Sequence, residues 1–144
     1  MAAGTERSIE LERIGLGRLR LRNARGGEIT VGTGDDADFS PVELLLAAIG
    51  GCTAVDVDYI TSKRADPEHL IVSVRGDRIR DESGGNRMIN IETVFDVAFP
   101  DGADGDAARS VLPRALQQSH DRLCTVSRTV ESGTPIISRL ADAP

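Results

Sequence analysis

Residues 40–64 read SPVELLLAAIGGCTAVDVDYITSKR and predict a long helix around which the rest of the chain is organised. Ser40 suits the N-cap, Pro41 suits the first helical position, and Glu43 stands three residues after the cap, as in a capping box. Apolar residues then recur at steps of three and four, and others widen the stripe until the helix is apolar almost all round. The stripe consists of Leu45, Ala48, Cys52, Val55 and Tyr59. We therefore expect a core helix, not a surface helix.

Two glycines, Gly50 and Gly51, interrupt this helix directly before Cys52, one of only two cysteines. Each glycine costs about 1 kcal/mol relative to alanine in a helix interior. We interpret the pair as a place where something approaches the backbone closely. Because free cysteine is among the most buried residue types, an inert core thiol is the alternative interpretation of Cys52.

The segments on either side of the helix alternate apolar and polar residues, which is typical of half-buried antiparallel strands. The expected elements are strands near residues 9–12, 18–22 and 28–31, the central helix, strands over 69–80 and 89–99, a helix over 103–120 with a kink or restart at Pro113, a short helical or turn segment at Cys124, and a last strand over 135–140. This order, βββ-α-ββ-α-β, indicates an α+β fold in one domain over residues 1–144.

The composition argues against a nucleic-acid-binding protein and against a membrane protein. The net charge of −6 argues against nucleic acid as a partner, because binding to a phosphate backbone relies on clustered Lys and Arg. The N-terminal sequence MAAGTERSIE has no apolar run and later segments lack about 20 consecutive apolar residues, so we expect neither a signal peptide nor a membrane span. We expect a cytoplasmic protein, in which thiols start reduced and two cysteines favour catalytic or redox chemistry over a structural disulfide.

No other constellation of residues predicts a site. The two histidines, His69 and His120, do not stand in a CxxC or HExxH type of spacing, so we expect no metal and no cofactor. A GxSxG elbow is absent as well, which leaves a serine hydrolase without support. Asp56 lies on an otherwise apolar helix and needs a hydrogen-bond or charge partner, and Thr53 is equally open to a structural role.

The residues around both cysteines resemble the OsmC/Ohr superfamily of osmotically induced and organic-hydroperoxide-resistance proteins. Residues 41–53, PVELLLAAIGGCT, continue through residues 55–57 and Lys63 in the manner of the first family motif, and residues 123–129, LCTVSRT, are similar to the second. The resemblance spans roughly residues 8 to 140. It implies antiparallel sheets wrapped around long central helices in an intertwined homodimer, with Cys52 and Cys124 facing each other in a small pocket at the dimer interface.

The same resemblance implies a thiol peroxidase that reduces organic hydroperoxides or hydrogen peroxide. Cys52 would attack the peroxide, Cys124 would resolve the resulting sulfenic acid as a disulfide, and a cellular thiol would reduce that disulfide. In such enzymes an arginine on an early strand, held by a glutamate at the start of the central helix, activates the first cysteine. Here Val42 stands where that glutamate is expected, and Glu43 follows one position later.

Three points stay open at the level of sequence. Glu43 is a candidate catalytic residue, yet a capping box explains it without catalysis. The candidate arginines are not distinguished by any motif; they are Arg13, Arg18, Arg20 and Arg22. The alternative function is a non-peroxidatic member of the same fold that binds a small ligand, with both cysteines only lining the pocket.

Overall fold

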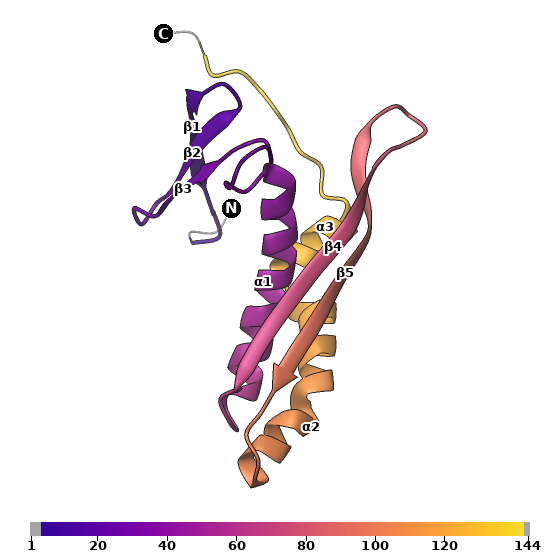
Figure 1. Ribbon diagram of the computed structural model, residues 1–144. Coiled ribbons are helices and arrows are strands. Elements are labelled where there is room, and N and C mark those ends of the chain that lie inside the picture. Colours follow the sequence, from indigo (N-terminus) through magenta and orange to yellow (C-terminus); the bar gives the residue numbers. More distant parts are fainter. Residues whose placement is uncertain (1–3, 143–144) are drawn as a thin grey trace. The chain divides into compact units, whose positions relative to one another are not determined.

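The computed structural model describes residues 4–142, with strands, helices and an extended C-terminal segment (Figure 1). Residues 1–3 and 143–144, at the ends of the domain predicted over residues 1–144, lie outside the described residues. The α+β class with antiparallel sheets is confirmed. The chain divides into two compact units, Met1–Leu46 and Ala47–Pro144, and the single domain stays a prediction.

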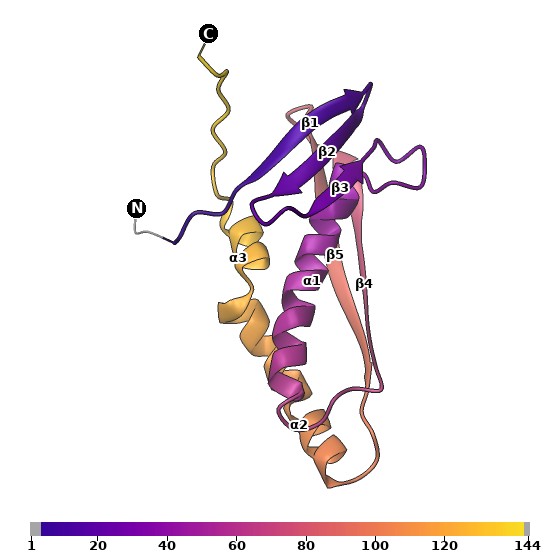
Figure 2. The ribbon, with the colours of Figure 1, turned by 90° about the vertical axis from the view of Figure 1, so that its left-hand side faces the viewer.

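The first unit contains a three-stranded antiparallel meander, seen clearly in Figure 2. Its strands are β1 (Ile9–Gly15), β2 (Arg18–Asn23) and β3 (Glu28–Val31). Gly17 closes the first hairpin at φ 67°, in the left-handed region that glycine adopts without steric cost. Leu11 pairs with Leu21 and Leu21 pairs with Ile29, so one apolar row crosses the sheet. The three predicted N-terminal strands are therefore confirmed.

Helix α1 (Pro41–Thr61) begins with the predicted capping box. The Ser40 N–H donates to Glu43 Oε1 at 3.0 Å, and the Glu43 N–H donates to Ser40 Oγ at 3.2 Å. Two N–H groups that a helix end leaves without partners are satisfied in this way. The sequence thus predicted the start of the helix to the residue.

The second unit packs a long hairpin and further helices alongside α1 (Figures 1 and 2). The hairpin is formed by β4 (His69–Arg80) and β5 (Asn86–Ala98), which pair in antiparallel register. Helix α2 (Ala103–Gln118) follows, and it continues without a break into a π-helical turn, η1 (Ser119–Leu123). Helix α3 (Thr125–Ser132) then starts directly after Cys124.

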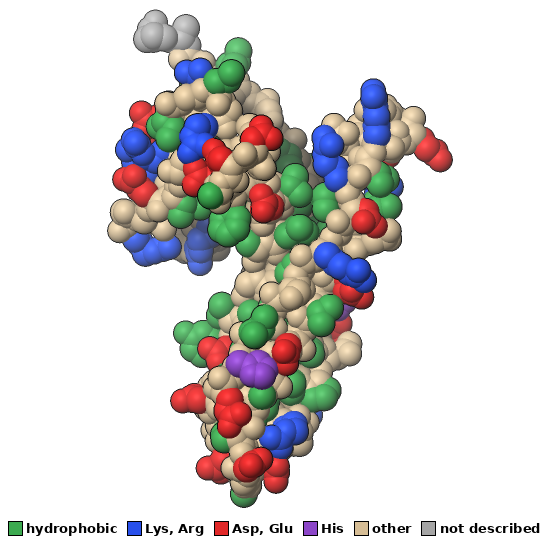
Figure 3. All heavy atoms as spheres, in the orientation of Figure 1, with side chains coloured by type: hydrophobic (Ala, Val, Ile, Leu, Met, Phe, Trp, Pro, Cys, Tyr) green, Lys and Arg blue, Asp and Glu red, His purple; other side chains and the backbone are tan. Residues whose placement is uncertain are grey.

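The packing of α1 corrects the predicted stripe. Val55 and Tyr59, which belong to the predicted stripe, are exposed. The buried side chains instead recur at every fourth residue: Ile49, Thr53, Val57 and Thr61. A row at intervals of four stays on one face of a helix, and this row is the one that meets the rest of the chain. The expectation of a helix covered on almost every side is not met by one chain, and apolar side chains reach the surface in Figure 3.

Gly50 explains how closely α1 approaches the hairpin. A Cβ atom at this position would lie 2.4 Å from Val74 Cγ2 and 3.4 Å from Val72 Cγ1, whereas one at Gly51 would have no neighbour within 4 Å. The expected close approach to the backbone is therefore made by strand β4. Gly50 has a packing role, so it lends no support to a catalytic interpretation of Cys52.

Two other expectations require correction. Pro113 lies inside α2, which does not restart there; the helical geometry changes only at Ser119, in the π-helical turn. The last strand predicted over residues 135–140 is wrong for the single chain, because this segment is extended but pairs with no strand in the described residues. Ile136 and Ile137 are 90% and 92% exposed, so their apolar side chains have nothing to pack against.

By length and composition alone, α1 is also apolar enough to cross a membrane. The core helix of a water-soluble protein meets the same two criteria, so these properties do not place α1 in a membrane.

Candidate functional site

Cys124 begins helix α3 and caps it with sulfur. Its side chain accepts the Ser127 N–H at 3.3 Å, and its Sγ is hydrogen-bonded to Ser127 Oγ at 3.2 Å. Thr53, on the buried face of α1, makes a further side-chain hydrogen bond to the same sulfur. The sulfur is 0% exposed and stands where the partial positive charge of a helix N-terminus is greatest. This environment suits a negatively charged sulfur.

Cys52, on α1, lies against the Cys124 sulfur. Its thiol is hydrogen-bonded to Cys124, and the backbone N–H of Val126 donates to its sulfur. Cys52 is only partly buried, in contrast to Cys124. Both residues are free thiols, and 124 − 52 = 72 residues separate them in the chain. The fold therefore brings together the two thiols that the sequence singled out.

The surroundings shift the pKa values of the two thiols in opposite directions. Burial raises the pKa of Cys52, the Val126 N–H lowers it, and the neighbouring Cys124 and the Asp56 carboxylate raise it further. Burial also raises the pKa of Cys124, but donors at Ser127, Cys52 and Thr53 outweigh that effect and lower it overall. The first negative charge of the pair therefore resides on Cys124, and Cys52 supplies an S–H donor.

Asp56 has the partner that its position on an apolar helix requires. The hydroxyl of Ser119, a residue with 0% exposure, donates to Asp56 Oδ2 at 2.8 Å and ties α1 to η1. This contact is sufficient to explain Asp56 as a structural residue.

A cavity of about 880 Å³ lies beside the cysteine pair in the second unit. Thr53 and Ser127, which both contact the Cys124 sulfur, are part of its wall. Its lining is largely apolar and comes mainly from β5, with Ile49 of α1 and Leu116 of α2. A space of this size, whose wall combines apolar side chains with polar and charged ones, fits a small ligand that has an apolar part.

The cavity wall contains three charged residues, Arg87, His120 and Glu131, and the last two are paired with each other. His120 Nε2 lies 2.9 Å from Glu131 Oε1 and links η1 to α3. Hydrogen bonds to Asp121 and then to Glu131 raise the pKa of His120. Both ring nitrogens of His120 face carboxylates, and no hydrogen bond joins them to either sulfur in the described part of the chain.

The family model for OsmC-like proteins matches residues 32–139, more than half of the chain. This chain belongs to the OsmC-like protein family. The membership that the two cysteine motifs predicted is therefore confirmed.

Solved structures share the fold of this OsmC-like chain. A hypothetical protein from Aquifex aeolicus VF5 is 24% identical, with a TM-score of 0.70 over 90% of this chain and 89% of that one. An OsmC-like protein of unknown function from Vibrio cholerae is 15% identical, with a TM-score of 0.72 over 88% and 94% of the two chains. The organic hydroperoxide resistance protein OhrB of Bacillus subtilis is 14% identical, with a TM-score of 0.55 over 88% and 92%. A comparison with curated proteins finds no match.

Glu43, the third residue predicted for the site, has the contacts of a helix cap. Hydrogen bonds from the Ser40 N–H and then the Ser40 hydroxyl lower the pKa of its carboxyl group. A catalytic role for Glu43 stays a prediction, and the capping box accounts for every contact given above.

The candidate arginines of this OsmC-like chain mostly have carboxylate partners within the first unit. Arg18 pairs with Asp36 and Asp38 of the acidic loop. Arg20 and Arg22 pair with glutamates on β1 and β3. No motif or contact selects one of the four as the activating cation.

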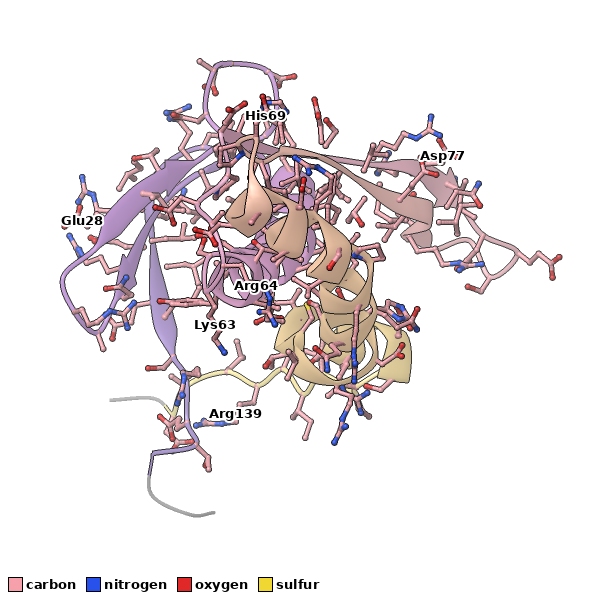
Figure 4. The ribbon with its side chains drawn as sticks, turned by 90° about the horizontal axis from the view of Figure 1, so that it is seen from below. Glu28, Lys63, Arg64, His69, Asp77 and Arg139 are labelled. Atoms are coloured by element: carbon pink, nitrogen blue, oxygen red, sulfur yellow. The ribbon has the colours of Figure 1, made fainter. Side chains whose placement is uncertain are left out.

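Three basic residues of the second unit are natural candidates as well: Arg87, in the cavity wall, pairs with Asp81 at 3.5 Å, and the other two come after α1. Lys63 and Arg64 follow the end of α1 and are labelled in Figure 4, and neither forms an ion pair in the described residues. Lys63 and Arg64 stand 11 and 12 residues after Cys52 (63 − 52 and 64 − 52), about three helical turns, which is too far for a direct contact.

Sequence reasoning missed Ser127 and the Val126 N–H, the groups that donate to the two sulfurs. A signal was available, because Ser127 stands three residues after Cys124, the spacing between Ser40 and Glu43 in the capping box. Cysteine is not a usual N-cap residue, since oxygen side chains dominate that position.

Proposed function

We propose that this protein is a cysteine-based hydroperoxide reductase. The observation that supports it best is the hydrogen bond between the Cys52 and Cys124 thiols, which 72 residues of chain (124 − 52) separate. Membership of the OsmC-like family, together with relatives named as hydroperoxide resistance proteins, supports a redox or stress-defence role. A cytoplasmic location remains part of this proposal.

In the proposed reaction, Cys52 attacks the terminal oxygen of the hydroperoxide. The O–O bond breaks, the alcohol leaves after protonation, and Cys52 becomes a sulfenic acid. Cys124 then attacks the Cys52 sulfur, water leaves, and a disulfide forms. A cellular thiol reduces this disulfide by exchange and restores both thiols. Cys52 is the attacking residue because it is the more accessible of the two.

An apolar hydroperoxide is the favoured substrate class. The cavity beside the pair is lined mostly by apolar side chains, and each methylene buried there contributes about 0.8 kcal/mol to binding. We expect large alkyl hydroperoxides to react faster than hydrogen peroxide.

We also propose that the protein acts as a homodimer. Apolar residues of α1 and of the C-terminal segment are exposed in the single chain, including Val55, Tyr59 and Ile137. Strand β1 is an edge of its sheet and can accept another strand. A second copy of the chain would cover these surfaces.

Stoichiometric alkyl hydroperoxide added to the reduced protein tests the reaction. We expect both thiols to disappear and an intramolecular disulfide to form. Cys52→Ser is expected to abolish peroxide consumption, whereas Cys124→Ser is expected to consume one equivalent and to hold a sulfenic acid at Cys52, detected by a dimedone adduct. Slow oxidation of both thiols, no faster than a free thiol, would contradict the proposal.

A binding role is the second candidate, and the cavity and the raised pKa of Cys52 favour it. In that case the protein would bind a small apolar or thiol-reactive ligand, and the cysteines would only line the site. The same oxidation experiment separates the two candidates, because a binding protein would retain its thiols.

A further inference from the structure

The activation of Cys52 is not explained by any cation described above. A cysteine attacks a peroxide as a thiolate, so its proton must be removed. Among the described residues, the group in contact with the Cys52 thiol that can accept a proton is the sulfur of Cys124. The Val126 N–H is a donor, and the Asp56 carboxylate is already bonded to Ser119.

Cys124 is held as an acceptor. The N–H of Ser127 donates to its sulfur, and the sulfur is also hydrogen-bonded to the hydroxyls of Ser127 and Thr53 and to the thiol of Cys52. Charge-assisted hydrogen bonds of this kind are about twice as strong as neutral ones. The sulfur is also excluded from solvent, so it is placed to exchange a proton with Cys52 but not to meet a bulky peroxide first.

Other charged groups near the pair have partners of their own. On β5, Arg87 of the cavity wall pairs with Asp81 at 3.5 Å. On α1, Asp56 is the charged group that acts on Cys52, and it disfavours a thiolate there. On η1 and α3 the charged side chains engage one another or the backbone, namely His120 with Asp121 and Glu131, and Arg128 with the Asp121 carbonyl oxygen.

We propose that Cys124, whose sulfur accepts the Ser127 N–H at the start of α3, is the base that takes the proton of Cys52 while Cys52 attacks the hydroperoxide. Ser127 and Thr53 are positioning residues, because they act on the reaction through Cys124. The inference rests on the proposed peroxidase function and assigns the activation step within it.

The step balances without another reactant. The Cys52 sulfur bonds to the terminal oxygen of the hydroperoxide, the O–O bond breaks, and alkoxide leaves with the electron pair, while the thiol proton moves to Cys124. The alkoxide takes that proton and leaves as alcohol, which restores the Cys124 thiolate. This thiolate attacks the Cys52 sulfur, the S–O bond breaks, and hydroxide leaves and is protonated by solvent. A cellular thiol then supplies the two electrons that reduce the disulfide.

The test compares three residues at position 124 in the full-length protein. Serine and aspartate both serve well as N-caps, so Cys124→Ser and Cys124→Asp retain the start of α3, but only aspartate supplies a base. The rate of the first oxidation of Cys52 is measured by stopped flow with tert-butyl hydroperoxide between pH 5 and about pH 10, a range that spans the ordinary thiol titration. We expect Cys124→Ser to slow this step about a hundredfold near neutral pH and Cys124→Asp to restore part of the rate.

Thiolate absorbance at 240 nm gives a readout that does not depend on activity. We expect one thiolate per chain to form below the ordinary pH range of cysteine in the wild type. That early titration should be absent from Cys124→Ser and present in Cys52→Ser. A thiolate that persists in Cys124→Ser would belong to Cys52 and would overturn the inference.

The positioning residues are tested with matched controls. Ser127→Ala and Thr53→Val are each expected to slow the first oxidation about tenfold, because each removes a donor to a charged acceptor. Ser132→Ala, in the same helix, and Thr61→Val, on the same buried row of α1, remove hydroxyls bonded only to oxygen atoms, and we expect wild-type rates.

Failure of this inference is distinct from failure of the proposed function. If Cys124→Ser oxidises Cys52 as fast as the wild type, with the same pH profile, then Cys124 is not the base, although the protein is still a peroxidase. If the wild type does not react, the proposed function itself fails.

Discussion

The contact between Gly50 and strand β4 gives a quantitative test of the fold. Adding a methyl group with Gly50→Ala places a Cβ atom 2.4 Å from Val74 Cγ2, a separation at which the helix or the strand must move. Overpacking of this kind costs about 1–3 kcal/mol. Alanine is about 1 kcal/mol better than glycine in a helix, so we expect a net loss of about 0–2 kcal/mol.

Gly51→Ala is the matched control, because it makes the same chemical change one residue later in the same helix. A Cβ atom there has no neighbour within 4 Å, so only the helix propensity changes, and we expect a gain of about 1 kcal/mol. The two variants should therefore differ by about 1–3 kcal/mol in the free energy of unfolding, which is the overpacking term.

Urea unfolding of the reduced variants, followed by circular dichroism at one fixed protein concentration, measures this difference in the free energy of unfolding. The double variant Gly50→Ala/Val74→Ala should recover part of the loss, since the smaller side chain makes room for the added methyl group. Equal stabilities for Gly50→Ala and Gly51→Ala would refute the close packing of α1 on β4.

Two other predictions concern the helix cap and assembly. The Ser40 N–H lowers the pKa of Glu43 in the folded protein. Its contribution to stability is therefore present above the unfolded pKa and is lost as the pH falls through the folded pKa. Glu43→Gln should remove this part of the acid dependence of the urea midpoint. In sedimentation experiments at micromolar concentration we expect a dimer for the full chain and a weaker dimer after deletion of residues 135–144, and a monomeric full chain would contradict the homodimer.

The sequence predicted most of the local structure because local signals determine it. Ser40 and Glu43 define the start of α1, and alternating apolar residues define the strands on both sides. The segment over residues 135–140 shows the limit of such signals. Its alternation is that of a strand, but a strand also needs an edge to pair with, and the sequence does not indicate where that edge lies.

The sequence predicted which cysteines form the candidate site, but not the groups that shift their pKa values. The cysteine motifs indicated Cys52 and Cys124, whereas the donors that lower the pKa of Cys124 come from Thr53 on α1 and Ser127 on α3. Which residues of two distant segments face each other depends on tertiary packing, so no spacing in the sequence predicts it. The role of Gly50 could not be predicted for the same reason. Its contact, Val74, is 24 residues further along the chain (74 − 50).

Helix α3 has two roles in this protein, since it forms part of the cavity wall through Val130 and Glu131 and it holds the Cys124 sulfur at its first turn. Thermodynamic linkage connects these roles. An occupant of the cavity that binds more tightly when α3 is fully formed must also increase the fraction of Cys124 present as thiolate. By reciprocity, ionisation of Cys124 must increase the affinity for that occupant by the same factor.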